Sequence, residues 1–101
     1  MPLRVSPPIH PGEILRDEFL CPLNLKPYTL AKKLKTSRAR IERLVREEAP
    51  ITVDTALPLG KFFGTTPDFW INLQSACDLT LAESEAAEGW LNEIPVLHAA
   101  A

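Results

Sequence analysis

The basic side chains of this 101-residue sequence are concentrated in one short stretch. Residues 26–46 hold eight of the eleven Lys and Arg residues and one acidic residue, Glu42. Residues 47–101 hold one basic and nine acidic residues. The chain as a whole has a net charge of −2, which argues against a protein that coats nucleic acid along its entire surface. We interpret residues 26–46 as a contact site for an anionic partner, with a merely solvated basic face as the alternative.

The spacing of apolar residues within the basic stretch predicts two short helices, over residues 27–34 and 38–47, joined by a turn. The positions that would face a core are Leu30, Ala31, Leu34, Ile41, Leu44 and Val45. Ser37 suits the N-cap of the second helix, because its hydroxyl can accept a hydrogen bond from a free amide of the first turn. The pattern indicates a helix-turn-helix, whose second helix enters the major groove of DNA.

The residue types on the second helix fit DNA chemically. Its outer positions carry Arg38, Ala39, Arg40 and Arg43, and the planar guanidinium of arginine can bond to guanine O6 and N7 together. The residues placed better for phosphates are Lys32, Lys33, Lys35 and Arg46. Ser37 and the amides beside it could also meet a phosphate.

Four further helices are predicted around this pair, and no strand, because alternating apolar patterns are absent. The first begins at Pro11 and ends before Pro22. The next begins after Thr52, contains Pro58 and ends at Gly64. Another begins at Pro67. The spacing of Thr80 and Glu83 is that of a capping box and predicts a separate short helix there.

We therefore expect three regions: a flexible N-terminal arm (1–9), a helix-turn-helix domain (10–79) and an acidic helical extension (80–101). No apolar run approaches the roughly 18 residues that cross a bilayer, so we expect no membrane contact. Two cysteines and two histidines without ligand spacing predict no metal and no cofactor, and a cytoplasmic protein fits. No nucleophile or phosphate-loop motif is present, so we do not expect an enzyme.

Several motifs together resemble one family. They are HPGEIL (10–15), TLA (29–31), SRARI (37–41), ITVDTAL (51–57) and FGTTPDFWINLQ (63–74). From residue 10 to about residue 81, the sequence is similar to the HigA antitoxins, a branch of the Cro/C1-type (XRE) helix-turn-helix superfamily. The resemblance implies an all-α, lambda-repressor-like DNA-binding domain, here with five to six short helices.

The resemblance also implies a function. Such proteins are bacterial antitoxins of type II toxin-antitoxin modules that neutralise a small basic toxin, a HigB/RelE-like RNase that cuts messenger RNA. They form homodimers and repress their own operon at a palindromic double-stranded operator. Two alternatives stay open: a stand-alone transcriptional regulator without a toxin, and a protein-interaction module that has lost DNA binding.

Transferred to the matching positions, the resemblance makes Arg38, Ala39 and Arg43 the candidates for base contacts. The candidates for contacts with the DNA backbone are Lys32, Lys33, Lys35, Thr36, Ser37, Arg40 and Arg46. No catalytic residue is implied.

The sequence departs from the family pattern at a few positions: Lys26 where a capping serine is common, Lys35 where glycine is usual at a left-handed helix end, Glu47 and Glu48 where basic residues follow the recognition helix, and Pro58 and Gly60 in the fourth helix.

Most of the other notable residues, outside the basic stretch, are expected to have structural roles. His10 is expected to fix the entry into the first helix, and Cys21 and Cys77 are expected to be buried. The aromatic group formed by Phe62, Phe63, Phe69 and Trp70 is interpreted as core packing, with a dimer contact as the alternative. Trp90 lies in an acidic segment and either covers the core or anchors a partner chain.

Overall fold

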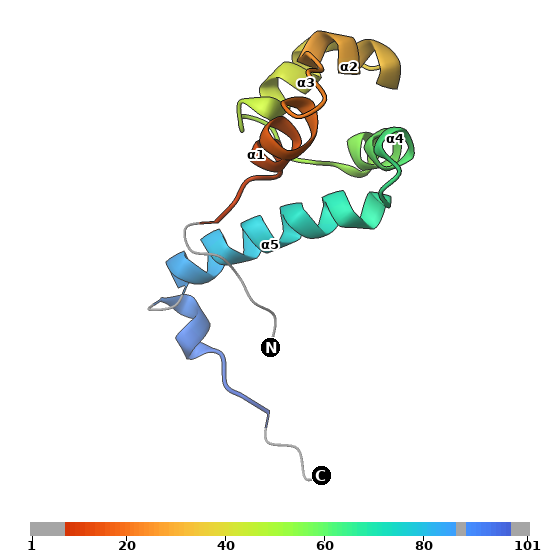
Figure 1. Cartoon of the computed structure of the whole chain (residues 1–101). Coiled ribbons are helices and arrows are strands. Elements are labelled where there is room, and N and C mark those ends of the chain that lie inside the picture. Colours follow the sequence, from red (N-terminus) through yellow and green to blue (C-terminus); the bar gives the residue numbers. More distant parts are fainter. Residues whose placement is uncertain (1–7, 87–88, 98–101) are drawn as a thin grey trace.

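A computed structural model of the chain describes residues 8–86 and 89–97. This part is entirely helical and contains no strand, which confirms the predicted all-α class. Figure 1 shows the arrangement. The elements in chain order are α1 (Pro11–Ile14), the π-helical segment η1 (Leu15–Leu20), α2 (Pro27–Leu34), α3 (Arg38–Val45), α4 (Val53–Phe63), α5 (Pro67–Ala86) and the 3-10 turn η2 (Trp90–Glu93). In the described part, no helix is both long and apolar enough to cross a membrane.

The start of α1 is fixed by His10, as the sequence predicts. Its Nδ1 accepts a hydrogen bond from the backbone N–H of Gly12 at 2.9 Å, and Pro11 occupies the first helical position. Gly12 is buried against the end of α3, where an added Cβ would overlap the carbonyl oxygen of Leu44. The first turn of α1 therefore packs backbone to backbone against α3.

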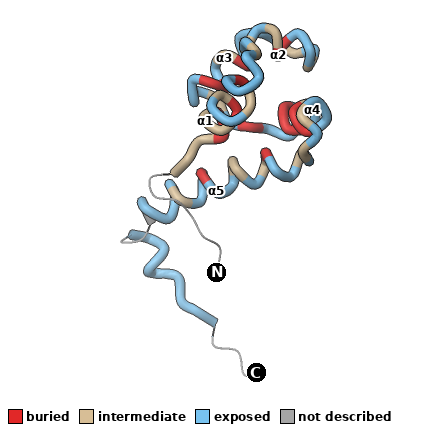
Figure 2. Tube along the Cα trace, in the orientation of Figure 1, coloured by how far each residue is buried: buried red, intermediate tan, exposed pale blue. Residues whose placement is uncertain are grey.

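The core lies between η1, α2, α3 and α4 and includes Trp70 near the start of α5, and the buried positions are marked in Figure 2. Trp70 is the largest of its fully buried side chains. The indole N–H of Trp70 donates to the hydroxyl of Thr65 at 3.0 Å, so its burial leaves no polar group unpaired. The other buried hydrophobic residues of this cluster are Leu15, Leu20, Leu30, Ala31, Ile41, Leu44, Val45, Ile51, Ala56 and Leu59.

An aromatic cluster joins η1 to the junction of α4 and α5. The ring of Phe19 lies 4.8 Å from that of Phe63 and 5.1 Å from that of Trp70, measured between centroids. Phe69 lies at the rim of the same cluster, with its ring centroid 6.2 Å from that of Phe19 and 5.0 Å from that of Trp70. The core interpretation therefore holds for Trp70 and Phe63, whereas Phe62 and Phe69 remain exposed.

The prediction of a separate helix from Thr80 is wrong. α5 runs without a break from Pro67 to Ala86, because no glycine or proline follows Pro67 in that range. The hydroxyl of Thr80 donates to the carbonyl of Ala76 at 2.8 Å, one turn earlier in the same helix, instead of capping a new one.

The boundary expected at residues 79 and 80 falls inside α5, and most of the expected arm 1–9 lies outside the described residues.

Cys77 is buried, and desolvation raises the pKa of its thiol. Cys21 is exposed, contrary to expectation, because it follows η1 in the turn that leaves the core.

The close approach of α1 and α3 predicts the effect of Gly12→Ala. The added methyl group must push the two helices apart, so the free energy of unfolding should fall by about 2–3 kcal/mol in urea denaturation. Gly89→Ala is the control, because its Cβ would meet only the Glu85 carbonyl oxygen, at 3.9 Å; its effect should stay within about 0.5 kcal/mol. Equal stabilities for the two variants would contradict the packing described.

Candidate nucleic-acid interface

The turn between α2 and α3 has the geometry that its sequence predicts. Lys35 ends α2 in the left-handed conformation, with φ at 57°, where glycine is the residue without strain. The N–H of Thr36 closes the turn on the carbonyl of Ala31 at 3.0 Å. Lys26 precedes α2 and makes no side-chain cap, so Pro27 alone favours this helix start.

Ser37 caps α3, as the sequence predicts. Its hydroxyl accepts a hydrogen bond from the N–H of Arg40 at 3.1 Å. Ile41, Leu44 and Val45 bury one face of α3 in the core. The opposite face is therefore left to polar side chains, and α2 and α3 form the predicted helix-turn-helix.

Arg16 fixes the other end of α3. Its Nη1 donates to the carbonyl of Val45 at 2.7 Å and reaches the carboxylate of Glu47 at 3.3 Å. The hydrogen bond to Asp17 raises the pKa of Arg16 most, desolvation opposes this rise, and the hydrogen bond to Glu47 adds to it. α3 ends at Val45, two residues earlier than expected, because Glu47 adopts a left-handed conformation.

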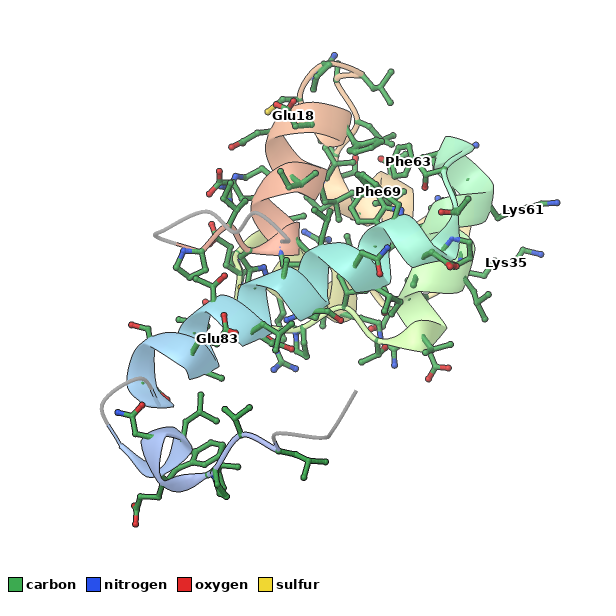
Figure 3. The ribbon with its side chains drawn as sticks, turned by 90° about the horizontal axis from the view of Figure 1, so that it is seen from below. Glu18, Lys35, Lys61, Phe63, Phe69 and Glu83 are labelled. Carbon is green, nitrogen blue, oxygen red and sulfur yellow. The ribbon has the colours of Figure 1, made fainter. Side chains whose placement is uncertain are left out.

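Most of the predicted DNA-contacting residues lie on the surface of the helix pair. Ala39, Arg40 and Arg43 are exposed on α3 and line a hollow of about 350 Å³ that extends to Thr52 and Thr55 at the start of α4. The other exposed members of the set are Lys32, Lys33, Lys35, Ser37, Arg38 and Arg46, whereas Thr36 is half-buried. Lys35 extends into solvent in Figure 3.

Arg38 has partners that the sequence interpretation missed. Its Nε donates to Glu42 Oε2 at 2.9 Å, and its guanidinium carbon lies 5.3 Å from the centroid of the Tyr28 ring. The other Glu42 oxygen lies 3.9 Å from Arg46 Nη2. The i, i+4 spacing of Arg38 and Glu42 was a usable signal. The contact with Tyr28 depends on how α2 crosses α3, so no spacing in the sequence indicated it.

The acids that follow α3 face arginines. Glu47 pairs with Arg16, and Glu48 lies 3.7 Å from Arg46. Their charges are thus partly balanced within the protein instead of standing alone beside the basic face.

The chain is similar to several known proteins, although no protein-family model matches it. Virulence-associated protein I of Dichelobacter nodosus is 51% identical over 79 residues, covering 78% of this chain and 73% of that protein. Antitoxin HigA-1 of Vibrio cholerae is 35% identical over 72 residues, covering 71% and 68% respectively.

A solved structure of the Pseudomonas aeruginosa antitoxin HigA with the higBA promoter superposes on this chain with a TM-score of 0.85 and 44% sequence identity. The match covers 89% of this chain and 98% of that one. The chain belongs to the HigA family of antitoxins. In this HigA-family chain, the helix-turn-helix that the family shares is retained despite the lysine in its turn.

The left-handed lysine gives a test of stability. Lys35→Gly should raise the free energy of unfolding by about 0.5–1 kcal/mol, because relief of the strain exceeds the added chain entropy of glycine. Lys33→Gly removes the same charge within regular α2 and should lower the free energy of unfolding by about the same amount. Chemical denaturation of both variants measures the two signs, and a loss of stability in Lys35→Gly would refute the strain.

Proposed function

We propose that this HigA-family chain is an autorepressing antitoxin that binds operator DNA through α3. The observation that carries the proposal is the exposed basic face of a helix held at both ends, by the Ser37 cap and by Arg16. The promoter complex of the P. aeruginosa relative supports it. Arg38, Ala39 and Arg43 would contact bases, and the remaining basic residues would contact phosphates. The proposal assigns no catalytic step to the chain.

A homodimer is part of this proposal. Two copies would present their α3 helices to a palindromic operator, with half-sites about 34 Å apart or a multiple of that distance. One α3 alone contacts only a few base pairs, so the second copy supplies the site length that specificity needs.

Neutralisation of a small basic RNase toxin is the second part of the proposal. The end of α5 and the segment after it combine acidic residues, among them Asp78, Glu85 and Glu93, with exposed apolar side chains. Trp90 is 64% exposed, so it does not cover the core, which leaves partner binding as its proposed role. An acidic surface with an aromatic anchor complements a basic partner.

The first prediction concerns DNA. Binding through about six phosphates should give a slope near −5 for log affinity against log salt concentration. Arg43→Ala should weaken operator binding by about 1–3 kcal/mol and relax base specificity, because it loses a base contact. Arg46→Ala is the matched control and should weaken operator and random DNA equally. Fluorescence anisotropy titrations measure both.

A flat salt response, or no binding to DNA, would favour the interaction module that has lost DNA binding. Salt-dependent binding without discrimination between operator and random DNA would contradict specific operator recognition. Equal losses for Arg43→Ala on both DNAs would show that Arg43 contacts only phosphate.

The second prediction concerns the toxin. Expression of the small basic reading frame adjacent to this gene should arrest growth, and co-expression of this chain should relieve the arrest. Trp90→Ala should reduce the relief and weaken toxin binding by about 2 kcal/mol or more. Leu23→Ala is the control, since Leu23 is similarly exposed, at 61%, but lies in the turn after η1. Specific operator binding without any relief would favour the stand-alone regulator.

A further inference from the structure

One carboxylate lies among the arginines of α3. Glu42 is the single acid of residues 26–46, and its side chain is 28% exposed. It contacts Arg38 through Oε2 at 2.9 Å and approaches Arg46 through Oε1 at 3.9 Å. A negative charge here weakens the attraction of α3 to DNA phosphates. A different role would explain why an acid occupies this position.

The geometry at Arg38 indicates such a role. The hydrogen bond to Glu42 uses Nε, which leaves the two terminal nitrogens of the guanidinium available. Those two nitrogens form the end of the fork that bonds to guanine O6 and N7 together. The ring of Tyr28, at 5.3 Å, flanks the guanidinium and restricts its rotation further.

We propose that Glu42 is a positioning residue that sets base specificity: with Tyr28 it holds Arg38 oriented for one guanine. This inference rests on the proposed binding of operator DNA and extends it to a residue that acts through Arg38. Exposed ion pairs contribute little to folding stability, so the effect of Glu42 is expected in recognition. An arginine that is already ordered loses less side-chain entropy on binding than a free one.

The charge of Glu42 has a second consequence. When Glu42 is removed, Arg38 becomes free to reach phosphates, and Arg46 loses one of the two carboxylates that face it. Binding to random DNA should therefore tighten while discrimination falls. A residue with a purely structural role would weaken both kinds of binding together.

The experiment measures Glu42→Ala and Glu42→Gln on three DNAs: the operator, operators with single base substitutions, and random sequence. In Arg38→Ala, substitution of one base pair should no longer change the affinity for the operator. That base pair is the one that Arg38 contacts. At that base pair, Glu42→Ala should lower discrimination about tenfold. On random DNA it should bind about threefold tighter, with a salt slope steeper by about one. Glu42→Gln keeps an acceptor for Arg38 Nε and should lose less discrimination.

Glu48→Gln is the matched control for charge. It removes an equal charge from a carboxylate that approaches Arg46 but not Arg38. It should tighten binding to random DNA without changing discrimination at the Arg38 base pair. Tyr28→Phe keeps the ring and should behave like wild type, whereas Tyr28→Leu should reduce discrimination. Circular dichroism and thermal unfolding confirm that each variant is folded.

The double variant Arg38→Ala/Glu42→Ala completes a thermodynamic cycle. If Glu42 acts through Arg38, Glu42→Ala should have no further effect on discrimination once Arg38 is absent. Undiminished discrimination in Glu42→Ala, while wild type binds its operator specifically, would overturn the role of Glu42 and leave the proposed function intact. Absence of specific binding by wild type would overturn both.

Discussion

The contact between the backbone of α1 at Gly12 and the carbonyl of Leu44 sets the position of the helix on which the proposed function depends. It allows the two helices to approach without a side chain between them. Arg16 then bonds to the carbonyl of the next residue, Val45, so that α1 and η1 hold the last turn of α3 at two points. With this end fixed, the first turn of α3, which carries Arg38, projects away from the core.

A second group of contacts places α4 relative to α3. Gln74 of α5 accepts a hydrogen bond from the N–H of Ile51 at 2.7 Å, which holds the loop between the two helices. Buried Gly60 lies against the start of α5, where an added Cβ would clash with the backbone of Thr66 and Pro67. This departure from the family pattern thus has a packing reason. α4 continues through Pro58 even though the proline ring cannot donate a helical hydrogen bond.

The features that the sequence could predict are those that local chemistry determines. The Ser37 cap and the role of His10 at the start of α1 each depend on a few neighbouring residues, and both were predicted. The left-handed conformation of Lys35 followed instead from the family resemblance. The prediction of a helix starting at Thr80 failed because the capping-box spacing, threonine followed by glutamate three residues later, also occurs inside helices. The clamp by Arg16 and the contact of Tyr28 with Arg38 join residues distant in sequence, so no spacing pattern could reveal them.

The ion pairs show how the chain divides its positive charge. Within the described residues, Arg16, Arg38 and Arg46 each face a carboxylate, whereas Lys32, Lys33, Lys35, Arg40 and Arg43 have no ion pair. The unpaired charges therefore lie on α2, in the turn and at Arg40 and Arg43 of α3, while carboxylates face Arg38 at the start of α3 and Arg46 after its end. Electrostatic attraction would then draw the duplex toward the turn and the exposed face of α3, which also carries Arg38. In the proposed complex, the unpaired Arg43 would contribute both to this attraction and to base contact, whereas Arg38, whose charge faces Glu42, would contribute mainly to base contact.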